Sequence, residues 1–245
     1  MISSLLWPVS RVSDLSPLTG IDVWAWSLIR PSLDWKFDSQ ILSSSELDRL
    51  GRFHFDVDRV RYAISHANTR KILSHYTGIA PRQLEFVVSS TGKPSLAASQ
   101  NPKLTFNLSH TSTVALLAVS SENEIGIDVE TVRPIELDVA EAHFSVSELS
   151  DLKSLNDSQW LEGFYNCWTR KEAILKAEGI GLDPPLSSFD VSLLPGQPPQ
   201  LIRWIPSAKI SRSWNLVHLV PTSDTVGALA FDNPAATIRL HSFFQ

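Results

Sequence analysis

The chain has 245 residues, of which 43% are hydrophobic and 19% charged, so it can build the core of one large or two small domains and is not a disordered tail. Its longest apolar run, Val114 to Val119, is far shorter than the roughly 20 residues of a membrane helix. The N-terminus lacks the basic region and apolar core of a secretory signal, and the single cysteine, Cys167, excludes an internal disulfide. We expect a cytoplasmic protein without a membrane partner.

Charge is distributed unevenly along the chain. The formal net charge of −5 argues against a general nucleic-acid binder. Residues 1–105 contain 12 Lys or Arg and 9 Asp or Glu, whereas residues 106–245 contain 9 and 17. This pattern fits two solvated faces of unlike charge, and it also fits an anion bound by the first part and a cation bound by the second.

The first part of the chain predicts a strand, two helices and further strands. A strand is expected over residues 23–29. Ser43, three residues before Glu46, indicates a capping box for a short helix ending near Phe53. Apolar residues recur every three or four positions over 58–76, and Gly78 stands where that long helix should end. The next strands are expected at 84–88, 104–108, 114–119 and 124–130.

The second part repeats this outline. A long helix is expected over residues 158–178, with Gly179 after it, followed by strands at 201–204, 214–219 and 226–231. We therefore predict an α+β fold of two halves, residues 1–105 and 106–245, each with a small sheet packed on a long helix. Neither half contains a complete set of reactive groups, so the site is expected in the cleft between them.

Two acidic residues share one face of the strand at 124–130. Alternation sends Ile125 and Ile127 to the core and Asp128 and Glu130 to the other face, about 7 Å apart at roughly 3.3 Å per residue. Oxygen ligands at this spacing suit Mg²⁺. An exposed strand face with alternating acids explains the pattern equally well.

The second long helix carries a stripe of functional side chains. Trp168, Glu172 and Lys176 are spaced by four and lie on one face. Glu172 could supply a third carboxylate and Lys176 a phosphate contact. A Glu172 to Lys176 ion pair beside a core Trp168 is the alternative.

Two further motifs could bind an anion. Ser109 and His110 follow a predicted strand, and without a Gly-x-Ser-x-Gly elbow they are better suited to contact a phosphate than to act as a hydrolase nucleophile. The tripeptide Gly92-Lys93-Pro94 predicts a turn that fixes a lysine at a strand end.

In order and spacing, the motifs at 92–94, 106–110, 125–130 and 168–176 resemble the 4′-phosphopantetheinyl transferases of the larger, surfactin-synthetase-activating (Sfp-like) type. The similarity covers about residues 45 to 190, and its Trp…Lys-Glu-Ala motif is similar to a subgroup tied to carrier proteins of primary metabolism. The resemblance implies transfer of phosphopantetheine from coenzyme A to a serine of an apo acyl or peptidyl carrier protein, releasing adenosine 3′,5′-bisphosphate. It also implies a monomeric pseudo-dimer of two similar halves.

The resemblance assigns roles to individual residues. It implies that Asp128, Glu130 and Glu172 bind Mg²⁺, and that Lys176 contacts the pyrophosphate. The catalytic base for the incoming serine is then Glu172, with Glu130 as the second candidate. The coenzyme A contacts that it implies are Arg49, Arg61, Gly92, Lys93, Pro94, Ser109, His110 and Lys176. Where better-known members carry a basic pair, this chain has Glu46 and Arg49.

The carrier protein is expected to dock on the second half, where four residues offer either apolar contact or core packing: Val132, Ile135, Leu137 and Phe144. Arg133 at the rim would speed association with an acidic carrier. Two other functions remain possible: a catalytically silent module that binds coenzyme A or a carrier protein, and a magnesium-dependent phosphohydrolase or nuclease.

Overall fold

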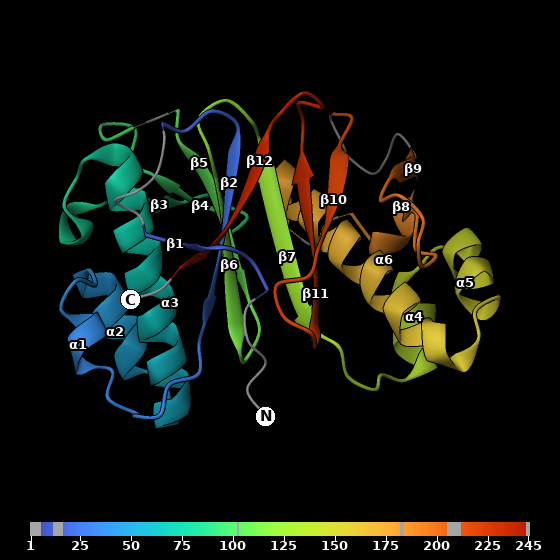
Figure 1. The fold of residues 1–245 in the computed structure, drawn as a ribbon, viewed down its shortest axis with the longest axis horizontal. Coiled ribbons are helices and arrows are strands. Elements are labelled where there is room, and N and C mark those ends of the chain that lie inside the picture. The colour runs from blue at the N-terminus through green and yellow to red at the C-terminus, as the bar shows by residue number, and fades with distance from the viewer. Residues whose placement is uncertain (1–5, 12–16, 102, 182–183, 205–211, 244–245) are drawn as a thin grey trace.

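Two sheets meet at the centre of the molecule, and one long helix covers the outer side of each (Figure 1). The structure is a computed structural model that describes residues 6–11, 17–101, 103–181, 184–204 and 212–243. Small helices and two-stranded ribbons complete each side. The predicted α+β class is confirmed.

The first sheet has five strands in the order β1 (Val9–Ser10), β12 (Ile238–Phe243), β2 (Ile21–Ser27), β6 (Val114–Ser120) and β5 (Thr105–His110). β5, β6 and β2 pair antiparallel, whereas β12 runs parallel to β2. The sheet therefore takes three strands from beyond residue 104, and the predicted division after residue 105 does not follow the strand pairing.

The second sheet has three antiparallel strands: β10 (Asn215–Leu219), β11 (Thr225–Phe231) and β7 (Ile125–Thr131). β7 lies beside β5 of the first sheet, and Asn107 Oδ1 accepts a 2.8 Å hydrogen bond from the Ile127 N–H. Ile125 and Ile127 are buried in an apolar cluster with residues of β2 and β6, as the alternation predicts. The other face of β7 is turned toward the second long helix.

The helices and ribbons fall into two series that resemble each other. The first series is α1 (Lys36–Ser39), α2 (Ser44–Gly51), α3 (Asp56–Thr77), the 3₁₀ turn η2 (Pro81–Gln83), β3 (Phe86–Val88) and β4 (Pro94–Leu96). The second is α4 (Leu137–His143), α5 (Val146–Lys153), α6 (Asp157–Glu178), η3 (Leu186–Ser188), β8 (Phe189–Val191) and β9 (Leu201–Trp204). Both long helices end as predicted, at Gly78 and Gly179 with φ of 72° and 67°.

The two long helices pack on their sheets by different means. Trp24 and Trp26 of β2 are fully buried in the apolar cluster that includes Ile64 of α3. In the second half, Gly126 of β7 takes the place of a side chain, because an added Cβ would lie 2.1 Å from the carbonyl oxygen of Ala173. This close approach holds the acidic face of β7 directly against α6.

A buried acid and cation recur in each half. In the first cluster, the Glu46 carboxylate closes the capping box at Ser43 and bonds Arg70 Nε at 2.7 Å. Arg70 also donates to the carbonyl oxygens of Pro81 and Leu84 at 2.7 and 3.0 Å. These bonds attach α2, η2 and the residue after it to α3.

The second cluster has the same plan on α5 and α6. Glu148 closes the capping box at Ser145 and lies 2.8 Å from Lys171 Nζ. Lys171 donates to the carbonyl oxygens of Leu186 and Phe189. Among the described residues, no helix combines the length and apolar character needed to cross a membrane.

Candidate active site

Three carboxylates and a lysine face one cavity of about 690 Å³ between β7, α6 and the end of β5. We call it the carboxylate cavity. The predicted site residues on its wall are Ser109, His110, Asp128, Glu130, Glu172 and Lys176. Trp168 and His143 also line it, with their rings edge to face at 5.5 Å. Residues up to 67 positions apart in the sequence thus meet at one place.

Asp128 is the most enclosed of the three acids, with 4% of its surface exposed. Its Oδ1 accepts hydrogen bonds from Ser109 Oγ at 2.9 Å and from Lys176 Nζ at 2.6 Å. Lys176 Nζ also donates to Ser109 Oγ at 3.0 Å. The second oxygen, Oδ2, is buried and has no hydrogen-bond partner. A buried anionic oxygen without a partner is costly unless a cation or donor meets it.

The other two carboxylates resist ionisation. Burial raises the pKa of Glu130 to about 7, and the negative charge of Asp128 adds to this effect. Burial and Asp128 also raise the pKa of Glu172. The positive charges of Lys176 and Arg133 act on Glu130 but leave its pKa raised, so the group lacks positive charge that a divalent cation would supply.

The donor set fits a hard divalent ion such as Mg²⁺, because it consists of carboxylate oxygens and a buried one of them, Asp128 Oδ2, has no hydrogen-bond partner. In the described ranges, however, no three His, Cys, Asp or Glu side chains are already arranged as a metal site. Lys176 holds the side chain of Asp128 in an ion pair instead. The predicted ligands share a cavity but do not form a preformed metal centre.

The Gly92-Lys93-Pro94 turn lines a second cavity of about 260 Å³, the turn cavity. Gly92 adopts φ of 91°, which favours glycine. Lys93 points inward, where Nζ donates to the carbonyl oxygens of Ile125 and Ala177 at 3.2 and 3.0 Å. Burial lowers the pKa of this lysine. Lys93 thereby ties the turn to β7 and α6. The turn cavity adjoins the carboxylate cavity, because Glu172 and Lys176 line both.

A third and larger cavity of about 920 Å³, the helix cavity, opens between α2, α3 and the β3–β4 ribbon. It shares Gly92, Pro94 and Leu108 with the turn cavity, so the three cavities adjoin in series, and we refer to them together as the cleft. Polar residues on its wall include Arg49 of α2 and Tyr62, His66, Thr69 and Arg70 of α3, and Arg82 and Glu85 contribute charges of opposite sign from the segment before β3.

Positive charges gather where the helix and carboxylate cavities approach each other. Burial lowers the pKa of His110. The positive charges of His66, Lys176 and Arg49 lower it further. Because each of these groups acts on His110, cations from α2, α3 and α6 surround the end of β5. Such a place favours an anion.

Most predicted site residues line the cleft, but Arg61 lies on the neighbouring face of α3. Its Nη1 is 3.4 Å from Asp58 Oδ1, while Tyr62 and His66 face the helix cavity. The sequence reasoning did not identify Tyr62, His66, Thr69 or Arg70. Tyr62, His66 and Arg70 are spaced by four and Thr69 follows His66 by three, and this helical spacing is the signal that could have identified them.

The predicted docking segment is only partly exposed. Phe144 is 3% exposed and packs on Phe164, with ring centroids 5.2 Å apart. Val132 and Ile135 pack against the same core, whereas Leu137 is 43% exposed. Val146 at the start of α5 is 87% exposed. Of the four residues, Leu137 therefore offers the largest apolar surface to a partner.

Comparison with known proteins matches both halves of the chain to one group of enzymes. Residues 124–233 match the family described as the 4′-phosphopantetheinyl transferase superfamily. Residues 25–122 match the family described as 4′-phosphopantetheinyl transferase, N-terminal.

Individual relatives agree with these families. The chain is 36% identical over 213 residues to the 4′-phosphopantetheinyl transferase HetI of Nostoc sp., covering 86% of each protein. It is 32% identical over 152 residues to the 4′-phosphopantetheinyl transferase Sfp of Bacillus subtilis, covering 62% of this chain and 66% of that protein. A human L-aminoadipate-semialdehyde dehydrogenase-phosphopantetheinyl transferase is 26% identical over 206 residues, covering 78% of this chain and 66% of that protein.

Proposed function

This chain belongs to the 4′-phosphopantetheinyl transferase superfamily, and we propose from that premise which of its residues carry the reaction. The enzyme transfers phosphopantetheine from coenzyme A to carrier proteins. We infer that Asp128, Glu130 and Glu172 hold Mg²⁺. The observation that supports this most directly is the convergence of all three carboxylates on one cavity that also contains Lys176.

Mg²⁺, when bound, offsets negative charge on the pyrophosphate of coenzyme A. The protein side chains orient the phosphates and move the proton. Lys176 Nζ lies between Asp128 and Ser109, where its ammonium group can contact a phosphate oxygen from the same cavity. Ser109 Oγ holds the Asp128 carboxylate in place from β5.

The serine of the carrier needs a base, because its hydroxyl is a weak nucleophile near neutral pH. Glu172 is our first candidate and Glu130 the second. Both carboxylates line the carboxylate cavity, and burial raises the pKa of each. A carboxylate with a raised pKa is a stronger base than an exposed one, and a positioned base contributes about 10² to 10⁴ in rate.

The adenosine end of coenzyme A is assigned to the turn cavity and the helix cavity. Gly92 and Pro94 line both, and Lys93 fixes the turn from behind. Arg49 and His110 are proposed to attract the 3′-phosphate. Arg61 stays a prediction for the same phosphate. In this scheme the first half binds the adenosine end, and the second half binds the metal and the carrier.

We further propose that the protein acts as a monomer with an internal pseudo-two-fold relation. The two 22-residue helices and the repeated acid and cation clusters support this relation. Carrier docking is assigned to the surface around Leu137, with Arg133 attracting an acidic carrier. The preference for carriers of primary metabolism stays a prediction.

The direct test is transfer from coenzyme A to an apo carrier protein, read as a mass gain of one phosphopantetheine while Mg²⁺ is varied. Asp128→Asn should lower the transfer rate on the order of 100-fold or more, because the variant loses an anionic ligand. It should also weaken the increase in melting temperature that Mg²⁺ produces.

Glu122→Gln, an exposed carboxylate in the loop before β7, is the matched control and should behave as wild type. Full activity of Asp128→Asn at low Mg²⁺ would remove Asp128 from the metal ligands. Mg²⁺-dependent hydrolysis of coenzyme A without a carrier would instead favour a phosphohydrolase.

A further inference from the structure

Lys176 of α6 is, among the described residues, the one cation in ion-pair contact with a proposed metal ligand. Its Nζ lies 2.6 Å from Oδ1 of Asp128 and 3.0 Å from Oγ of Ser109. Ser109 Oγ donates to the same Oδ1 at 2.9 Å. Asp128 carries a single negative charge, so the part of it that neutralises Lys176 is lost to any second cation. The lysine and a divalent ion therefore compete for one carboxylate.

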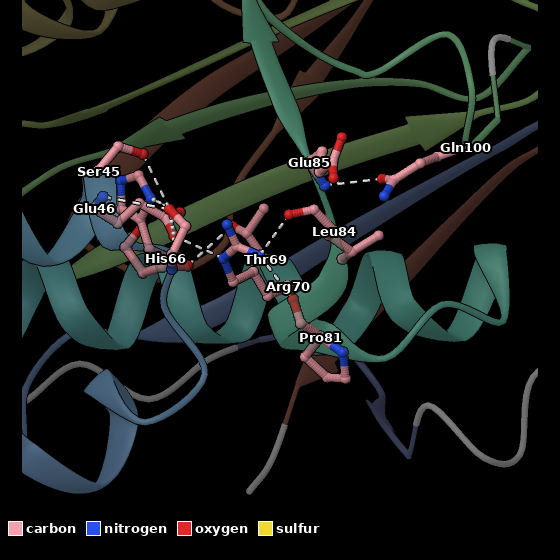
Figure 2. Close-up of polar contacts among 11 residues, drawn as sticks. Ser45, Glu46, His66, Thr69, Arg70, Pro81, Leu84, Glu85 and Gln100 are labelled. Carbon is pink, nitrogen blue, oxygen red and sulfur yellow. Dashed lines mark hydrogen bonds and ion pairs between the residues drawn. The ribbon is translucent and has the colours of Figure 1, made fainter.

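The ammonium group of Lys176 is free to change partners, unlike the buried cations of the two clusters. Figure 2 shows Arg70 held by Glu46 and by the carbonyl oxygens of Pro81 and Leu84, and its side chain is only 1% exposed. The side chain of Lys176 is 30% exposed and bonds one carboxylate and one hydroxyl. Its ammonium is a point charge on a flexible stem, so it can move without disturbing the fold.

A second anion comes within reach of Lys176 when coenzyme A binds. Lys176 lines both the turn cavity and the carboxylate cavity. The proposed function assigns the adenosine end of coenzyme A to the first of these cavities and the metal to the second. The pyrophosphate follows directly after the adenosine, so it lies where the two cavities adjoin. Lys176 can then exchange Asp128 for a phosphate oxygen, while Ser109 still holds Asp128 from β5.

We propose that Lys176 couples the binding of coenzyme A to the binding of Mg²⁺ by exchanging Asp128 for the pyrophosphate. The proposal rests on the function proposed above. Paired with Asp128, Lys176 weakens the attraction of that carboxylate for a divalent cation. Paired with a phosphate, it leaves Asp128 its full negative charge. By linkage, each ligand strengthens the binding of the other by the same factor.

The contribution of Lys176 must be separated from the direct attraction between Mg²⁺ and the pyrophosphate. Both make Mg²⁺ bind more tightly when coenzyme A is present, so wild type alone does not distinguish them. Lys176→Met removes only the first. Without coenzyme A, the variant should bind Mg²⁺ about tenfold more tightly than wild type, because the competing cation is gone. With coenzyme A, the two proteins should differ by less than about threefold, because Lys176 has already left Asp128.

Calorimetric titration with Mg²⁺, in the absence of any carrier protein, tests the proposal. Each protein is titrated alone and again when saturated with coenzyme A, at one fixed pH, so the readout is binding and not turnover. Arg133→Gln is the control, because Arg133 places a positive charge near Glu130 but is not bonded to Asp128. Its Mg²⁺ affinity should change by less than about threefold in either state.

Two results would overturn the proposal. If Lys176→Met binds Mg²⁺ more tightly by the same factor in both states, Lys176 only repels the ion and exchanges nothing. If its affinity equals that of wild type in both states, the ion pair does not compete with the metal. Should Lys176→Met fail to fold because the buried Asp128 loses its cation, Lys176→Gln gives the same comparison, since a neutral amide can still donate to Asp128.

Failure of the proposed function has a different signature. A wild-type protein that shows the expected affinities but transfers nothing to any carrier would overturn the proposed function and leave the coupling in place. A wild-type protein that binds Mg²⁺ in neither state would overturn the metal site and the coupling together.

Discussion

The first and second clusters have the same plan but different surroundings. Glu46 and Glu148 each close a capping box and pair with a cation on a long helix. Oε1 of Glu148 accepts from the backbone N–H of Val191 at 2.8 Å, whereas Oε1 of Glu46 meets the side chain of His66. The hydrogen bond from the Val191 N–H to Glu148 stabilises the fold and has no further role. A titratable side chain on a cavity wall can also take part in binding.

The two clusters also differ in the exposed fraction of their acidic side chains. The side chains of Lys171 and Glu148 are 0% and 2% exposed, while Glu46 is 9% exposed and lines the helix cavity. The repeated arrangement is therefore a structural support in the second half. In the first half, the same arrangement also positions a residue at the cleft.

The largest expected effect comes from a substitution that breaks the ion pair of the second cluster. Lys171→Met leaves the buried Glu148 without its cation and should lower the free energy of unfolding by about 3–5 kcal/mol in urea denaturation. Adding Glu148→Gln should recover part of the loss, because a neutral amide still accepts from the Val191 N–H. The matched change Arg70→Met should cost less, since Glu46 keeps His66 as a partner. Equal losses in the two halves would show that His66 does not compensate for the missing cation in the first cluster.

The next largest effect comes from disrupting the close packing of α6 on β7, which differs from the packing of α3 on its sheet. Gly126→Ala places a Cβ 2.1 Å from the Ala173 carbonyl oxygen, so β7 and α6 must separate. Overpacking of this kind costs about 3 kcal/mol. Transfer activity should fall more steeply than stability, because Asp128 and Glu172 move apart. Gly51→Ala, where an added Cβ meets nothing within 4 Å, is the control. Normal activity in Gly126→Ala would show that the close approach is not needed.

Acid unfolding tests the first cluster. The pKa of Glu46 falls from 4.5 to about 2 on folding, so its contribution to stability is complete above pH 4.5 and is lost as pH falls toward 2. The shift corresponds to a contribution on the order of 3 kcal/mol. Glu46→Gln should therefore show a flatter decline of melting temperature between pH 5 and 3. A decline as steep as that of wild type would assign the acid sensitivity to other carboxylates.

Local signals predicted much of the fold and of the site. The capping box at Ser43, the helix ends at Gly78 and Gly179, and the alternation around Asp128 depend on neighbouring residues, so the sequence reveals them. The capping box at Ser145 has the same signature and was overlooked.

Features that depend on distant pairing could not be predicted in this way. The pairing of β12 with β2 joins residues more than 200 positions apart, and no periodic pattern reveals it. Lys176 pairs with Asp128 rather than with Glu172, the partner in the alternative interpretation, because β7 lies directly against α6. The burial of Phe144 likewise depends on where α4 packs.

The smallest expected effect distinguishes Arg49 of α2 from Arg61 of α3. Arg49 lines the helix cavity, whereas Arg61 is turned toward Asp58 on the neighbouring face. Arg49→Gln should weaken coenzyme A binding about tenfold, as expected for the loss of a charged phosphate contact. Arg61→Gln should weaken it no more than about threefold, because this half-buried arginine is turned away from the helix cavity and acts on the phosphate from a distance. Calorimetric titration at low and moderate salt measures both. If Arg61→Gln weakens binding as much as Arg49→Gln, the phosphate lies on the Arg61 face, and the contrast between the two clusters no longer explains how coenzyme A is held.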